Sequence, residues 1–168
     1  MDYANLVTNY VERFASKLTC FDDIRPHLAA LRKTPDVPHQ PLTSETSITQ
    51  RINAEKIALF FEQGASADDL LQAYIESLEH VHEPSTEMQP GDDLALLAVY
   101  VTLAKSSSVE NLIQAAAIAS YACEKSARAY KLRLLLIRLL LRLGCLKLAV
   151  YHFDALELKA VQLDTMSH

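Results

Sequence analysis

The stretch that decides how the chain is interpreted is "KLRLLLIRLLLRLGCLKLAVYHFDALEL", residues 131–158. Its abundant leucines and regularly spaced arginines allow three interpretations: a membrane segment, a basic nucleic-acid-binding arm, or part of a stack of helices. A membrane span needs roughly 18 or more uninterrupted apolar residues, whereas Arg133, Arg138 and Arg142 interrupt this stretch. The sequence therefore predicts no membrane partner.

The composition of the whole chain favours a helical domain. Its 168 residues are half hydrophobic and include no tryptophan and three glycines, with a net charge of −5. A chain of this length buries one core comfortably, and few glycines favour helices over a turn-rich sheet. Because the chain is acidic overall, we expect no DNA partner.

The cysteines and the N-terminal residues both point to the cytoplasm. Cys20, Cys123 and Cys145 form no C-x-x-C pair, so we expect reduced thiols rather than a zinc or redox site. Asp2 and Glu12 stand where a secretory signal needs a basic and then an apolar segment, so we expect no signal peptide.

Helix boundaries can be predicted from capping residues and prolines. We expect N-terminal helices over residues 1–33, with Thr19 and Asp22 capping the start of the second. Residues 34–47 contain three of the six prolines and predict an exposed loop. Helical hairpins are expected from residue 48 to residue 168.

The hairpins carry their own start and stop signals. A serine followed three residues later by an acidic residue predicts a capping box, and glycine predicts a left-handed helix end. We expect capping boxes at Ser66 with Asp69 and at Ser107 with Glu110, and helix ends at Gly64 and Gly144.

The last hairpins repeat with a period of roughly 34 residues, the period of tetratricopeptide units. Ala149, Phe153 and Leu156 have the spacing of the second helix of such a unit, and moving back by one period reaches Ala115, Ala119 and Ala122. Small residues at these places let neighbouring helix pairs approach closely. Period-two alternation is rare, so no sheet is expected.

We therefore predict an all-α fold of antiparallel helix pairs, stacked as a tetratricopeptide-like α-solenoid. Residues 1–168 would form one helical-repeat region, with repeat-like units at about 94–127 and 128–161. The region would be part of a longer solenoid.

The opening stretch also predicts a basic edge. On a helical wheel of about 100° per residue, the cations of one narrow sector are Arg128, Lys131, Arg138 and Arg142. The leucines fill most of the remainder, as in a helix with neighbours on both sides. Arg133 alone falls among apolar positions, where we expect it to snorkel or to pair with a carboxylate of an adjacent helix.

The basic edge has two interpretations. No acidic residue lies between Glu124 and Asp154, an interval with seven lysines and arginines. The edge is either solvated, with counter-charges from other helices, or a docking strip for an acidic protein surface or ribosomal RNA phosphates. Tyr130 is the only ring beside the basic residues, whereas RNA-binding surfaces usually stack bases on several rings. A protein partner is favoured.

Enzymatic chemistry is not indicated. The pairs of neighbouring aspartates stand at expected helix starts, where capping and the helix dipole explain them. His80 and His82 are two residues apart and do not share a helix face, and no glycine-rich phosphate loop is present. We expect no catalytic residue, no metal and no cofactor, and hence a binding module.

Several blocks resemble the auxiliary, non-catalytic subunit of the N-terminal acetyltransferase B (NatB) complex. The blocks are "YVERFASKLTCFDDIRPHL" at 10–28, "INAEKIALF" at 52–60, "PGDDLALLA" at 90–98 and the run from "YKLRLLLIRLLLRLG" at 130 to the final residue. The resemblance implies a tetratricopeptide-like scaffold that positions a catalytic acetyltransferase subunit near the ribosome. That other subunit would bind acetyl-CoA and acetylate chains beginning Met-Asp, Met-Glu, Met-Asn or Met-Gln.

The resemblance also implies that this chain is an internal portion, because the auxiliary subunits of the family are several times longer. A second hypothesis remains open. A free-standing tetratricopeptide adaptor would bind peptide tails of partner proteins and use the basic edge to hold a terminal carboxylate.

Overall fold

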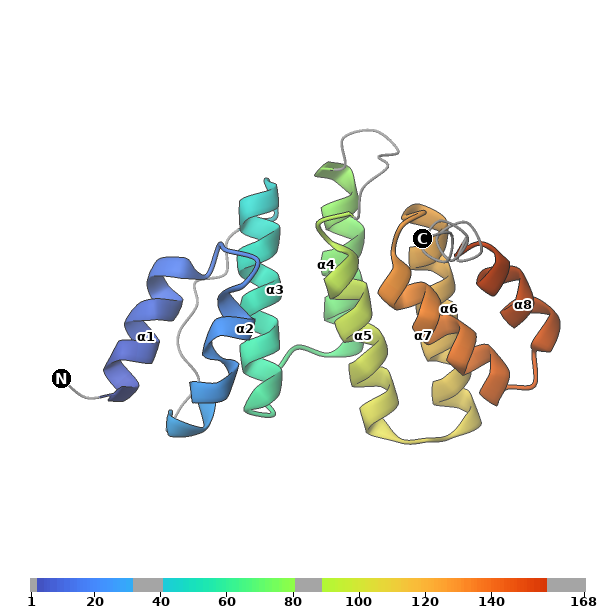
Figure 1. Ribbon diagram of the computed structural model, residues 1–168, viewed down its shortest axis with the longest axis horizontal. Coiled ribbons are helices and arrows are strands. Elements are labelled where there is room, and N and C mark those ends of the chain that lie inside the picture. Colours follow the sequence, from blue (N-terminus) through green and yellow to red (C-terminus); the bar gives the residue numbers. More distant parts are fainter. Residues whose placement is uncertain (1–2, 32–40, 81–88, 157–168) are drawn as a thin grey trace, which may run out of the picture. The chain divides into compact units, whose positions relative to one another are not determined.

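A computed structural model describes residues 3–31, 41–80 and 89–156 of the chain. Every regular element in these ranges is a helix, and helices adjacent in sequence pack in pairs, which confirms the all-α fold class (Figure 1). The chain forms two compact units, Met1–Glu83 and Pro84–His168. The single repeat region over 1–168 and its repeat boundaries stay predictions.

The described part of the first unit contains four α-helices and two short 3-10 helices. Its elements are α1 (Tyr3–Phe14), α2 (Cys20–Ile24), the 3-10 helix η1 (Arg25–Ala30), α3 (Glu45–Phe60), α4 (Ala67–Ser77) and the 3-10 helix η2 (Leu78–His80). Val11 of α1, Leu28 of η1 and Ile57 of α3 are fully buried in one core. This apolar contact holds α1, η1 and α3 together.

A buried amide links the turn after α1 to α3. The Asn53 side chain is 1% exposed. Its Nδ2 donates to the carbonyls of Ala15 and Lys17 at 2.8 Å each, and its Oδ1 accepts from the backbone N–H of Phe21. The turn has no regular structure to satisfy its backbone groups, so the amide does this in place of water.

The predicted helix after Thr19 is present but short. Thr19 occupies the N-cap position of α2, yet its side chain makes no capping bond. Instead its hydroxyl donates to Asp23 Oδ2. The α-helix lasts only five residues and continues as a 3-10 helix from Arg25, because Pro26 lacks the N–H that a longer α-helix would need.

The end of the proline-rich loop differs from the prediction by three residues. Of the predicted loop at 34–47, residues 34–40 lie outside the described ranges. Helix α3 begins at Glu45 rather than at residue 48. Ser44 caps it: the Ser44 hydroxyl accepts from the Ser47 N–H, and the Ser47 hydroxyl accepts from the Ser44 N–H. The capping pattern of serine followed by an acidic residue does not predict this box, because Ser47 occupies the third helical position in place of an acidic residue.

The left-handed residue after α3 is Glu62, with φ of 58°, and not Gly64 as predicted. Gly64 is required for another reason. A Cβ at this position would lie 2.4 Å from Leu59 Cδ2, so a larger residue would displace that leucine. Close approach, rather than handedness, explains this glycine.

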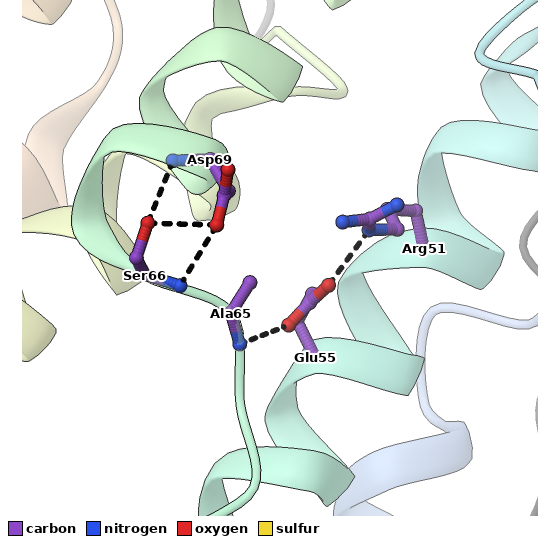
Figure 2. Close-up of polar contacts among 5 residues, drawn as sticks. All are labelled: Arg51, Glu55, Ala65, Ser66 and Asp69. Atoms are coloured by element: carbon purple, nitrogen blue, oxygen red, sulfur yellow. Dashed lines mark hydrogen bonds and ion pairs between the residues drawn. The ribbon is translucent and has the colours of Figure 1, made fainter.

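A buried carboxylate joins α3 to the turn before α4. Glu55 is 3% exposed, and its Oε1 lies 2.8 Å from Arg51 Nε one helical turn earlier. Its Oε2 accepts a hydrogen bond from the Ala65 N–H (Figure 2). The next residue, Ser66, forms the predicted capping box with Asp69, which is confirmed.

In its described residues, 89–156, the second unit contains four helices that pack in sequence. They are α5 (Asp92–Lys105), α6 (Val109–Lys125), α7 (Tyr130–Arg142) and α8 (Leu146–Asp154), and each runs antiparallel to the next (Figure 1). Gly144, with φ of 75°, ends α7 as predicted. The capping box expected at Ser107 is wrong, because Ser108 caps α6 by accepting from the Asn111 N–H.

Small residues line the helix contacts of the second unit. The predicted small positions Ala115, Ala119, Ala122 and Ala149 are all buried. Phe153 behaves differently: it is 49% exposed, because no described element packs on its side of α8. The small-residue pattern is therefore confirmed and the aromatic packing position is not.

None of the helices in the described ranges is long and apolar enough to cross a membrane.

Replacing Ala149 by glutamate should destabilise the fold. A buried small position would receive a charge without a partner, and we expect a loss of about 3 kcal/mol in the free energy of unfolding. The matched control is Val150→Glu on the same helix, since Val150 is 58% exposed. Urea unfolding measures both. Equal effects of the two substitutions would contradict the packing of α8.

Replacing Glu55 by alanine should also destabilise the fold. The Ala65 N–H loses its acceptor and Arg51 loses its ion pair, so we expect a loss of about 2 kcal/mol. Glu12→Ala, an exposed glutamate on α1, is the control. A thermal melt in which both variants match the parent would show that the link between α3 and the turn is dispensable.

Candidate functional site

The four cations predicted as a basic edge are all exposed. Lys131, Arg138 and Arg142 lie on α7, and Arg128 lies in the turn that precedes it rather than on the helix. The spacing of the three helical cations, seven and eleven residues from the first, places them on one side of α7. The three helical cations therefore lie exposed on one side of α7, with Arg128 in the preceding turn, and their binding of a partner stays a prediction.

Little internal charge compensates this basic edge. Lys131 Nζ lies 3.6 Å from Asp93 Oδ1 of α5, and the Lys131 side chain remains 64% exposed. An exposed pair of this kind contributes little to stability. Within the described ranges, Arg138 and Arg142 form no ion pair. Among the described residues, two guanidinium groups of the basic edge thus lack a carboxylate partner.

One structural role exists for Arg142. It stands in the last turn of α7, where the negative end of the helix dipole favours a cation. Lys131 and Arg138 lie too far from that end for the same explanation. The dipole therefore accounts for one member of the edge and leaves the others unexplained.

A buried aspartate fixes the start of α7 relative to α5. Asp92 is 3% exposed, and its Oδ2 accepts from the Ser126 hydroxyl at 2.7 Å and from the Gln89 N–H. Burial raises the pKa of the Asp92 carboxyl, although the two hydrogen bonds oppose the change. Because Ser126 ends α6 just before α7, this bond helps position the basic edge.

Arg133 does not behave as predicted. It does not snorkel, since it is 8% exposed, and among the described residues it pairs with no carboxylate; its Nη2 donates to the Ala127 carbonyl in the turn before α7. Its Nε has no hydrogen-bond partner in the structure. Burial and the nearby Arg133 charge together lower the pKa of His152 on α8. Arg133 is therefore a residue of the helix contacts and not of the basic edge.

Part of the apolar face of α7 is exposed, contrary to the prediction. Its leucines were expected to be covered on both sides, but Leu134 and Leu141 are about half exposed, at 49% and 51%, and Tyr130 is 42% exposed. Leu132 and Leu136 are buried as expected. To tell the exposed leucines from the buried ones, one must know which sides of α7 the neighbouring helices cover.

The thiols offer no activated nucleophile in the buried core. Burial raises the pKa of Cys20 and of Cys123 to about 11, far above neutral pH. Such thiols stay protonated and unreactive. Cys145 is exposed at the turn between α7 and α8, and all three cysteines are free in the structure.

A groove in the first unit has fewer free polar groups than the basic edge. Its cavity of about 340 Å³ lies between α1 on one side and α2 and η1 on the other, with Leu6 and Ile24 in its lining. The Tyr10 hydroxyl donates to Asp23, and the Tyr3 hydroxyl is bonded to His27. These rim groups hydrogen-bond one another, and Asp23 is the one carboxylate of the lining, so the groove offers less charge for selecting a ligand than the basic edge does.

Comparisons with known proteins agree on one family. Residues 2–168 match the family model described as the N-acetyltransferase B complex (NatB) non-catalytic subunit. The chain is also similar to the phagocyte signaling-impaired protein of Drosophila pseudoobscura pseudoobscura, with 25% identity over 197 residues. This alignment covers 99% of the chain and 20% of the relative, so the chain spans about a fifth of that protein. No solved structure matches the chain significantly.

Replacing Asp92 by asparagine should change how stability depends on pH. Burial raises the pKa of Asp92 in the folded state. The stability that Asp92 contributes is therefore fully present below its unfolded pKa and is lost as pH rises through the folded pKa. Asparagine cannot ionise. We therefore expect the free energy of unfolding of Asp92→Asn, relative to the parent, to increase between about pH 4 and pH 7.

Urea unfolding at several pH values measures this difference. Asp68→Asn, which changes an exposed aspartate in the first turn of α4, is the control for a general loss of charge. A constant difference between Asp92→Asn and the parent across this pH range would show that Asp92 is solvated.

Proposed function

Because this chain belongs to the family of the non-catalytic subunit of the NatB complex, we propose that it is a scaffold segment that helps hold the catalytic acetyltransferase subunit. The family match over residues 2–168 carries this proposal. The chain corresponds to 20% of the curated relative. The activity of the assembled complex therefore requires the catalytic subunit and the remainder of a longer scaffold.

The paired helices of the second unit support a scaffold role. Buried alanines bring α5, α6, α7 and α8 into close contact, and this makes a rigid support for a partner. The exposed cations of α7 provide charge at its surface. A scaffold needs a stable shape and a recognition surface, and it needs no reactive group of its own.

The proposed biological role follows the family. The catalytic subunit binds acetyl-CoA and transfers the acetyl group to nascent chains that begin Met-Asp, Met-Glu, Met-Asn or Met-Gln. This chain contributes to holding that subunit in the cytoplasm, close to the ribosome, where such N-termini emerge.

We assign the docking contact to the basic edge of α7. Arg138 and Arg142 have no internal ion pair within the described residues, and Lys131 has a weak one at 3.6 Å. Several cations on one side of a helix attract an acidic surface and accelerate its association. Arg128, in the preceding turn, extends the same positive surface.

The isolated chain should have no acetyltransferase activity. We expect no acetyl-CoA binding by calorimetry and no acetylation of Met-Asp or Met-Glu peptides, because the catalytic groups belong to the other subunit. Mixed with the purified catalytic subunit, the chain should co-elute with it in size-exclusion chromatography.

The variant Ala149→Glu is the control for specific association, since it should lose the packed second unit and the co-elution together. Acetylation by the chain alone would refute the scaffold assignment. Failure to associate with the catalytic subunit, combined with binding of peptide tails, would instead favour a free-standing adaptor.

A further inference from the structure

The exposed surface of α7 consists of two parallel rows of different chemistry. The apolar row contains Tyr130, Leu134, Ile137 and Leu141. The basic row contains the cations Lys131, Arg138 and Arg142, and Leu135 is the one apolar residue in it. Within each row the residues follow the spacing i, i+4, i+7, i+11, which keeps them on one side of a helix. The basic row is shifted from the apolar row by one residue, so the two rows run side by side.

The apolar row is not covered by the described residues. Leu134 and Leu141 are 49% and 51% exposed, Tyr130 is 42% exposed, and Ile137 is partly exposed. A single exposed leucine is ordinary, whereas a continuous apolar stripe bordered by charge is typical of a protein contact. The other side of α7, which includes Leu132 and Leu136, is already buried.

The charge of the basic row determines which kind of partner can cover the apolar row. Helix α7 has no acidic residue of its own, and Asp93 is the carboxylate paired with its basic row in the described part of the chain. A ligand that covers both rows therefore needs apolar side chains along one side and carboxylates along the other. Because α7 has 13 residues, the surface is roughly 18 Å long, which matches about three turns of a helix.

We propose that the two rows of α7 form a docking surface for an acidic amphipathic helix. This inference rests on the proposed function and places the helix in the catalytic subunit. Leucines of the partner would pack on Leu134 and Leu141 while its carboxylates bind Arg138 and Arg142. Two rows of different chemistry fix the rotation of the bound helix, which a basic edge alone would leave free.

The apolar row argues against RNA as the occupant. Phosphates would bind the basic row and gain nothing from Leu134 and Leu141. Single-stranded RNA would need rings for base stacking, and Tyr130 is the only aromatic side chain on α7. A protein helix uses both rows.

The test measures binding of the full chain to the purified catalytic subunit by calorimetry at several salt concentrations. Leu134→Ser/Leu141→Ser changes the apolar row, and Arg138→Glu/Arg142→Glu changes the basic row. The matched controls are Val109→Ser/Ile113→Ser on α6, both exposed, and Lys105→Glu/Lys147→Glu, also exposed.

We expect each row variant to weaken binding at least about tenfold. The salt dependence should fall in the arginine variant and stay unchanged in the leucine variant. The controls should stay within about threefold of the parent. Thermal melts should show that the leucine variant of the isolated chain is as stable as the parent.

Four outcomes would overturn the inference. Loss of binding in the arginine variant alone would mean a purely electrostatic contact and would leave the proposed function intact. A lower melting temperature of the isolated leucine variant would mean that the chain itself covers the apolar row. Displacement of the catalytic subunit by a 20-nucleotide oligouridine would assign the surface to RNA. Absence of any binding to the catalytic subunit would contradict the proposed function as well.

Discussion

The rotation of α7 about its own axis decides what the second unit can present to a partner. Leu132 and Leu136 are each 1% exposed and anchor the buried side of the helix. The 2.7 Å bond between Asp92 and Ser126 holds the preceding turn against the start of α5. A rotation of one residue, about 100°, would bury the cations and expose the core leucines. The packing and the buried bond together keep both exposed rows in place.

Local patterns predicted the helices and several of their ends. Ser66, Asp69 and Gly144 act through bonds or φ angles within a few residues, so their roles could be inferred from neighbours in sequence. Ala115 and Ala149 were predicted because a repeat period carries information about close contacts beyond local structure. These helix ends and small positions could be predicted because residue spacing alone determines them.

The features that could not be predicted depend on how side chains pack in three dimensions. Gly64 is required because the Leu59 side chain packs against it. The buried guanidinium of Arg133 is accommodated by its hydrogen bond to the Ala127 carbonyl. The exposed leucines of α7 are the clearest case. A helical wheel places Leu134 and Leu136 on different sides but does not say which side faces the core. The basic edge was therefore predicted without the apolar row beside it.

A photo-crosslink from α7 tests most directly whether this helix surface contacts the catalytic subunit. Leu134→Cys in a Cys145→Ser background provides a single exposed thiol, since Cys20 and Cys123 are buried with a pKa of about 11. A photo-reactive maleimide at residue 134 should crosslink to an acidic helical segment of the catalytic subunit, identified by mass spectrometry. A complex that forms without any crosslink from this position would contradict docking through α7.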